Sequence, residues 1–184
     1  MNNKHSTLLG GAGLLAMTLP VSMVVAGEYL SVETAQRAAF KQADRFDEVD
    51  LTLNADQQKA ILALAGPQPP HGKLRVWRAT QSGQLLGYFF TDEVIGRQDL
   101  ISYATSIDAG GKLGEVEILV YRETHGAEVK NRAWRRQFAG RDNLAKLQFT
   151  TDIKNIAGAT LSCEHVTQGV RWLLALWQTT LHGS

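Results

Sequence analysis

The stretch that decides the fold lies at residues 113–122 and reads Leu113-Gly114-Glu115-Val116-Glu117-Ile118-Leu119-Val120-Tyr121-Arg122. Within it, Val116, Ile118 and Val120 recur at every second position, and glutamates precede the first two. Because successive side chains of a β-strand point to opposite faces, this period of two predicts a strand in a sheet with one buried face.

Three more strands are predicted before this one, at residues 73–80, 84–92 and 100–108, where β-branched and aromatic residues are frequent. Ser82-Gly83 and Gly110-Gly111 stand between these runs and suit tight hairpin turns. Short hairpin connections join antiparallel strands, so we expect an antiparallel sheet of about four strands.

Helices are predicted on both sides of this strand region. Ser31 is a suitable N-cap for a helix over 32–46, and Asn54 for one that ends near Gly66. A short helical pattern covers 131–138. The last helix is the clearest, because its apolar residues are spaced by three and four: Val166, Val170, Leu173, Leu174 and Trp177. The expected fold is α+β, a twisted antiparallel sheet packed by helices from both ends of the chain.

The N-terminus has the pattern of an export signal. An uncharged run over residues 8–25 follows Lys4, which predicts a signal peptide at 1–26, with an uncleaved N-terminal anchor as the alternative. Residues 27–72 then form a helical segment and linker, and 73–184 the main domain. Either interpretation of the N-terminus places this domain in the periplasm or elsewhere outside the cytoplasm.

Composition excludes several classes of function. Lys and Arg number 19 against 18 acidic residues, so no excess of positive charge indicates nucleic-acid binding. The single Cys163 cannot form an intramolecular disulfide, and it cannot share a metal ion with His165, because side chains two apart on a helix point away from each other. Ser162 with His165 as base would need an acid partner that the sequence does not indicate.

A run of small and hydroxylated residues stands where the last helix begins: Ala157-Gly158-Ala159-Thr160-Leu161-Ser162. Unpaired N–H groups and the positive end of a helix dipole make such a junction an anion site, and small residues let a phosphate approach the backbone. The structural alternative is that Thr160 or Ser162 is an ordinary N-cap.

The motif Gly158-Ala159-Thr160 resembles the flavinylation motif of the FMN-binding domain family, whose members include the FMN-bearing subunits of the sodium-pumping NADH:quinone oxidoreductase and of the Rnf complex. The resemblance extends upstream to Gly87-Tyr88, Gly110-Gly111, Leu119-Val120-Tyr121-Arg122-Glu123-Thr124-His125-Gly126, Trp134 and Gln137-Phe138-Ala139-Gly140. Ala157, Lys154 and His125 depart from the family pattern of Ser, an acid and Pro, and Asp152 lies two residues from the acidic position.

The resemblance implies that a flavin transferase esterifies FMN to Thr160, with Gly158, Ala159, Leu161 and Ser162 near the phosphate. It implies that the isoalloxazine ring faces Tyr88, Glu123, Thr124, His125 and Gly126. The expected function is electron transfer between membrane-associated and extracytoplasmic redox partners, without turnover chemistry of its own. A noncovalent FMN-binding or sensing module, and a secreted adaptor domain without flavin, remain alternatives.

Overall fold

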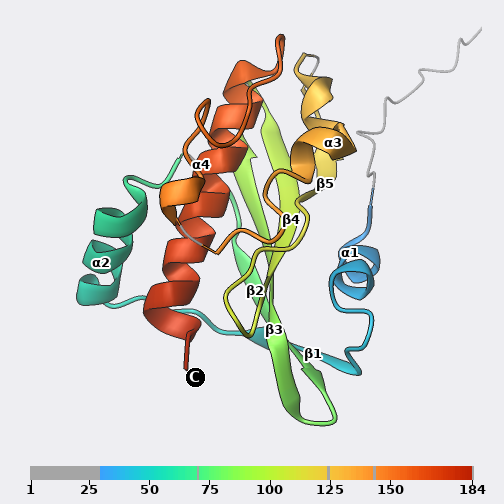
Figure 1. Cartoon of the computed structure of the whole chain (residues 1–184), viewed down its shortest axis with the longest axis vertical. Coiled ribbons are helices and arrows are strands. Elements are labelled where there is room, and N and C mark those ends of the chain that lie inside the picture. Colours follow the sequence, from blue (N-terminus) through green and yellow to red (C-terminus); the bar gives the residue numbers. More distant parts are fainter. Residues whose placement is uncertain (1–29, 70, 124, 143, 184) are drawn as a thin grey trace, which may run out of the picture.

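The computed structural model describes residues 30–69, 71–123, 125–142 and 144–183 (Figure 1). The predicted signal peptide lies outside these residues. Five strands form one antiparallel sheet in the order β1-β2-β3-β4-β5. Their bounds are Arg45–Val49, Arg75–Gln81, Gln84–Ile95, Leu100–Asp108 and Glu117–Tyr121. The α+β class is confirmed, with one strand more than expected.

The additional strand, β1, begins inside the region predicted as the first helix, 32–46, and continues beyond it to Val49. Helix α1 spans Val32–Ala39 and ends at Phe40, whose backbone (φ −128°, ψ 76°) is no longer helical. Phe40 instead packs against Phe46 of β1, with ring centroids 6.5 Å apart. Because Phe46 and Phe40 fill the same apolar layer, the chain turns back after α1 and pairs with β2 rather than continuing as a helix.

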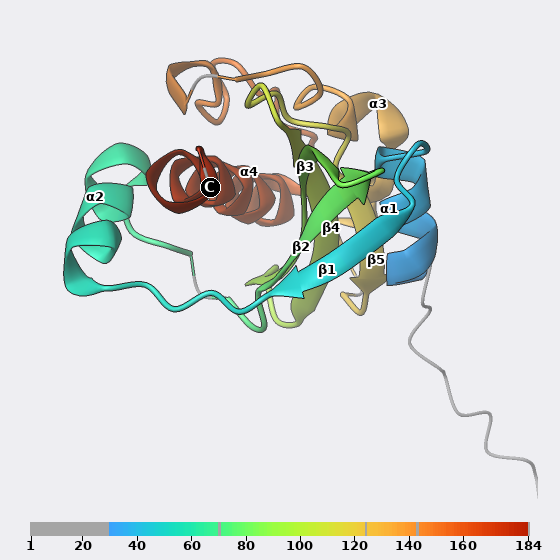
Figure 2. The same cartoon turned by 90° about the horizontal axis from the view of Figure 1, so that it is seen from below.

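Helices lie on both faces of the sheet, so the prediction of one buried face was wrong. Helix α4, Thr160–Leu176, crosses one face and continues as a π-helical turn over Trp177–Leu181. Helix α2, Ala55–Ala65, lies outside α4, and α1 covers the opposite face (Figure 2). The layer beneath α1 buries Ala35, Trp77, Phe89, Ala104 and Leu119.

The local signals for turns and caps acted as predicted. Ser82 and Gly83 both have positive φ (49° and 81°), the conformation of a tight hairpin between β2 and β3. Asn54 and Gln57 form the reciprocal capping box of α2. The described residues contain no helix with the length and hydropathy of a bilayer span.

A β-bulge interrupts the pairing of β4 with β5. Val120 pairs with Ser102 and Ile118 pairs with Tyr103, which leaves Leu119 as one extra residue in β5. An extra residue reverses the face on which all later side chains of the strand lie.

The bulge therefore decides what the end of β5 presents to α4. Ile118 and Tyr121 both belong to the core between the sheet and α4, although an odd number of positions separates them. Leu119 belongs to the layer under α1. If the same residues paired with β4 without a bulge, Tyr121 would face α1, away from the start of α4.

The segment between β5 and α4 is compact but mostly irregular. It contains the short helix α3, Arg132–Arg135, and two 3-10 turns, Ala127–Lys130 and Leu144–Lys146. The helix predicted over 131–138 is thus only one turn long. Phe138, beyond its end, is fully buried.

Candidate functional site

A cleft of about 330 Å³ opens at the N-terminal end of α4. Three segments line it: the β3–β4 turn, the loop after β5, and the start of the helix. Its residues are Arg97, His125, Gly126, Gly158, Ala159, Thr160, Leu161 and Ser162. All of these except Arg97 were predicted site residues, so the fold brings most of the predicted set together.

Thr160 is the first residue of α4, and its hydroxyl does not cap the helix. The N-cap is Ala159, with φ −120° and ψ 21° and no side-chain cap hydrogen bond. The Thr160 side chain is exposed, and its Oγ1 accepts a hydrogen bond from Asn155 Nδ2 at 3.0 Å. The structural alternative, a capping hydroxyl, is therefore not what this threonine provides. Its oxygen is oriented by a neighbouring amide and faces solvent.

The electrostatic character of the cleft favours an anion. The N–H groups of residues 160–162 cannot bond within the helix, and the positive end of the helix dipole lies there. Gly158 has a φ of +88°, and an added Cβ there would come no closer than 3.8 Å to a carboxylate oxygen of Glu128. The backbone at the motif is therefore open to a ligand.

The loop after β5 packs against the first turn of α4. The Tyr121 hydroxyl donates to the His125 carbonyl, and the Ser162 hydroxyl hydrogen-bonds to the Tyr121 oxygen. Burial raises the pKa of Tyr121, against the opposing effect of the bond from Ser162. Gly126, with φ +82°, fits between them: an added Cβ would lie 2.9 Å from Ser162 Oγ and 2.9 Å from the Tyr121 hydroxyl.

Two of the predicted ring-facing residues stand apart from the cleft, and a third is not described. Glu123 is buried, and its carboxylate is directed at the β3–β4 turn, where Oε1 accepts from the Gln98 N–H at 2.6 Å. Thr124 lies outside the described residues. Tyr88 is buried near the other end of α4 and lines a hollow with Thr180 and Leu181.

The distance along α4 separates Tyr88 from the cleft. The helix has 17 residues, which corresponds to roughly 25 Å at the usual rise. Tyr88 pairs with Ile107 near the β2–β3 hairpin end of the sheet, whereas Ile95, at the other end of β3, precedes the turn that carries Arg97. The structure therefore does not bring Tyr88 together with Thr160.

Aromatic residues behind the cleft hold the loop that leads into α4. Trp134 Nε1 donates to the Lys154 carbonyl at 2.7 Å, and Gln137 Oε1 accepts from the Lys154 N–H at 2.9 Å. Trp134 is buried and packs edge-on against Phe138, with centroids 5.3 Å apart. Trp134 and Gln137 together thus hold the backbone at Lys154, in the loop that carries the hydroxyl motif.

Two of the three departures from the family pattern, Lys154 and Ala157, lie in this same loop, whereas His125 lies in the loop after β5. The Lys154 side chain is exposed, so only its backbone is held. Asp152 Oδ2 accepts from the Gln148 N–H at 3.0 Å, which closes a turn before the loop. Its carboxylate is thus engaged by its own turn rather than directed at Thr160.

Cys163 lies behind the cleft rather than in it. Its side chain is completely buried, and burial raises the pKa of the thiol to about 11. A protonated, enclosed thiol is a poor nucleophile and a poor metal ligand. Its position one turn into α4 indicates packing.

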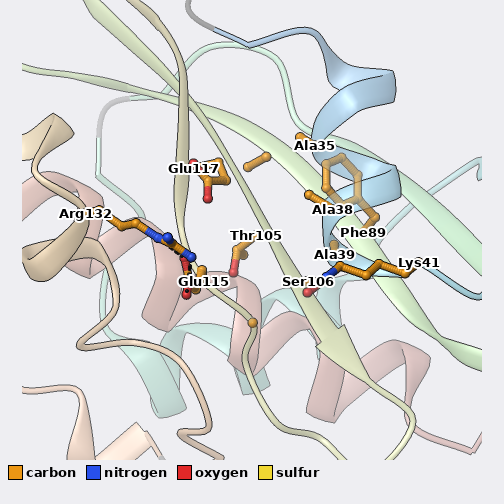
Figure 3. A pocket seen from close by; sticks show the side chains of 12 residues that line it. Ala35, Ala38, Ala39, Lys41, Phe89, Thr105, Ser106, Glu115, Glu117 and Arg132 are labelled. Carbon is orange, nitrogen blue, oxygen red and sulfur yellow. Dashed lines mark hydrogen bonds and ion pairs between the residues drawn. The ribbon is translucent and has the colours of Figure 1, made fainter.

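A second hollow, of about 370 Å³, lies on the other face of the sheet (Figure 3). Alanines of α1 line one wall, and Glu115 with its ion-pair partner Arg132 lines the opposite wall. Lys41 extends into the hollow from the α1 side. None of the predicted site residues lines this second hollow.

Comparison with known proteins gives one family match. Residues 96–175 match the family model described as the FMN-binding domain. The matched segment begins at Gly96, includes β4, β5 and the cleft loops, and ends within α4. No curated protein matches the chain.

Arg97 is the residue that sequence reasoning missed. It stands in the connection between two predicted strands, where a single arginine is unremarkable. Only the pairing of β3 with β4 and of β4 with β5 brings that connection beside the start of α4. The residue adjacent to it, Gly96, was a visible turn signal, but nothing local indicated a ligand.

Proposed function

We propose that the protein is an exported electron carrier with FMN attached to Thr160. The premise is that residues 96–175 are an FMN-binding domain of that family, which makes the chain a flavin-binding protein. The observation that carries the proposal is the state of the Thr160 hydroxyl. It is exposed, oriented by Asn155, not used as a helix cap, and placed in a cleft at a helix N-terminus.

The attachment reaction needs an accessible hydroxyl and a phosphate donor. In the proposed step the Thr160 oxygen attacks the flavin-side phosphorus of FAD, a new phosphoester bond forms, and the bond between the two phosphates breaks. AMP leaves, and the hydroxyl proton passes to a base of the flavin transferase. The hydrogen bond that Asn155 donates orients the Thr160 oxygen and leaves its own proton available for transfer.

The cleft residues then have separate tasks toward the nucleotide. The N–H groups at the start of α4 compensate the phosphate charge that remains after esterification. Leu161, an exposed apolar side chain in the cleft wall, offers surface to the flavin ring. When bound, FMN supplies one- and two-electron redox chemistry, and the protein supplies orientation and electrostatics.

A covalent bond suits a protein outside the cytoplasm, because a dissociated cofactor would be lost there. The proposed redox partners are membrane-associated on one side and extracytoplasmic on the other. Fractionation of cells that express the full chain, together with the N-terminal mass of the product, tests export and cleavage after residue 26.

Intact mass after coexpression with a flavin transferase tests the central claim. Attachment adds about 438 Da from the formula of the cofactor, and the flavin fluorescence stays with the protein band on a denaturing gel. Thr160→Ala should abolish the added mass, Thr160→Ser should retain it, and Ser162→Ala serves as the neighbouring-hydroxyl control. Bare polypeptide mass in the wild type would refute the covalent proposal.

The noncovalent alternative gives a different pattern. A yellow protein that loses its flavin on the denaturing gel would be a noncovalent FMN-binding or sensing module. A colourless product despite the transferase would indicate an adaptor domain. The exposed Thr160 hydroxyl favours the covalent function over both.

A further inference from the structure

The turn between β3 and β4 is fixed from outside by one carboxylate. Glu123 Oε1 accepts hydrogen bonds from the N–H groups of Gln98 at 2.6 Å and Asp99 at 2.9 Å. Within the turn, the Gly96 N–H donates to the Asp99 carbonyl at 2.8 Å. An added Cβ on Gly96 would lie 2.5 Å from Glu123 Oε1, so the carboxylate sits directly against the turn backbone.

The N–H groups of this turn stabilise the negative charge of Glu123. Burial alone would raise the pKa of Glu123, but the N–H donors of Gln98, Asp99 and Arg97, with the positive charge of Arg97, outweigh it and lower the pKa. The group is therefore an ionised carboxylate at neutral pH, and bonds from N–H groups to a charged acceptor are among the strong ones. A buried acid beside an anion-binding cleft would otherwise repel the ligand.

The same turn presents Arg97 to the cleft. Arg97 is exposed and lines the cleft together with Thr160 and Ser162. In the described part of the structure no hydrogen bond or ion pair engages its guanidinium. Its planar donor fork matches the oxygens of a phosphate.

We propose that Glu123 is a positioning residue, whose carboxylate fixes the 96–99 turn so that Arg97 pairs with the phosphate of the flavin nucleotide at Thr160. The inference rests on the proposed function. It assigns to Glu123 a task other than contact with the flavin ring, and it adds a side-chain cation to the N–H groups of α4. Glu123 therefore acts on the phosphate only through Arg97, since it orients the backbone that carries Arg97.

The test is the rate of flavin attachment in the wild type and in variants of Arg97 and Glu123, followed by intact mass in a time course with the transferase and FAD. Arg97→Gln and Glu123→Gln should each slow attachment by about tenfold, the usual loss for one hydrogen-bonded charge. The double variant should be no slower than the slower single variant, because both changes remove the same contact. Arg97→Lys should recover part of the rate.

Arg122→Gln is the matched control. Arg122 is also exposed and precedes Glu123, but it does not line the cleft, so its loss should leave the rate unchanged. Hydrogen exchange gives a readout specific to positioning: Glu123→Gln should speed exchange of the Gln98 and Asp99 amides, and Arg97→Gln should not.

The flavin itself separates the two possible roles of Glu123. If Glu123 faced the ring, Glu123→Gln would shift the midpoint potential and the visible spectrum of the attached flavin while Arg97→Gln would not. That result overturns the inference, and so does attachment at the wild-type rate in Arg97→Gln, an exposed substitution that leaves folding intact. A wild type that takes up no flavin would instead refute the proposed function.

Discussion

Replacing Gly126 with alanine tests whether the loop after β5 packs closely against the start of α4. The substitution adds one methyl group at a backbone with φ +82°. Two contacts follow at once, 2.9 Å to Ser162 Oγ and 2.9 Å to the Tyr121 hydroxyl. Both oxygens already take part in hydrogen bonds, so neither can move away without loss.

The expected loss of stability has two parts. A left-handed conformation costs an alanine about 1 kcal/mol. Relief of the two close contacts, through displacement of the loop or of the helix start, adds about 1–3 kcal/mol, the usual cost of overpacking. The free energy of unfolding should therefore fall by about 2–4 kcal/mol.

Gly140 is the matched control, because its φ is +76° and an added Cβ would meet nothing within 4 Å. Gly140→Ala should lose only the conformational part, about 1 kcal/mol. Urea unfolding followed by tryptophan fluorescence measures both variants, and intact mass measures their flavin attachment, which should slow in Gly126→Ala alone. Equal losses of stability in the two variants would show that the loop after β5 does not pack closely against α4.

Three further predictions concern buried side chains, one behind the cleft, one in the first turn of α4 and one in β3. Trp134→Phe removes the hydrogen bond to the Lys154 carbonyl, so it should lower the free energy of unfolding in urea by about 1–2 kcal/mol and slow flavin attachment. The control is Trp172→Phe, since no such bond is seen for Trp172 in the described residues. Equal effects of the two substitutions would contradict the role of Trp134 in holding the loop. Burial raises the pKa of the Cys163 thiol to about 11, so Ellman's reagent at mildly alkaline pH should label the unfolded but not the native protein, and rapid native labelling would refute its enclosure. Burial also raises the pKa of Asp92, so the folded state favours the protonated carboxyl and is destabilised by its ionisation at neutral pH. Asp92→Asn should therefore be more stable than the wild type at neutral pH, and this difference in unfolding free energy should shrink as the pH falls towards 3.8, the ordinary pKa. A difference that grows in acid would contradict the prediction.

The sequence predicted the site where the chemistry is local. The run from Gly158 to Ser162 joins a loop to a helix, and helix termini bind anions for reasons that need no tertiary structure. The strands were predicted because each has its own composition and turn signals. Arg97 was missed, and the contact of Glu123 with the β3–β4 turn was not predicted, because their partners belong to other parts of the chain.

The errors in the fold have the same physical origin. The spacing of apolar residues continued past Phe40, but packing of Phe40 on Phe46 ended the helix and allowed β1 to form. Glu115 and Glu117 suggested a solvent-facing side of the sheet, yet arginines neutralise both. The sequence also does not say which end of a strand meets the start of α4, so it could not show that Tyr88, a predicted site residue, lies away from the cleft.

The extra residue at Leu119 makes β5 one residue longer than a regular ladder with β4 requires. Deletion of this single residue would restore a regular ladder, in which Val120 still pairs with Ser102 and Tyr121 with Ile101, so both side chains would keep their sides. The phenol would remain beside the loop and Ser162. A deletion of the same size in the regular part of β3 would instead exchange the faces of all later side chains in that strand, so tolerance to shortening should differ sharply between these two strands.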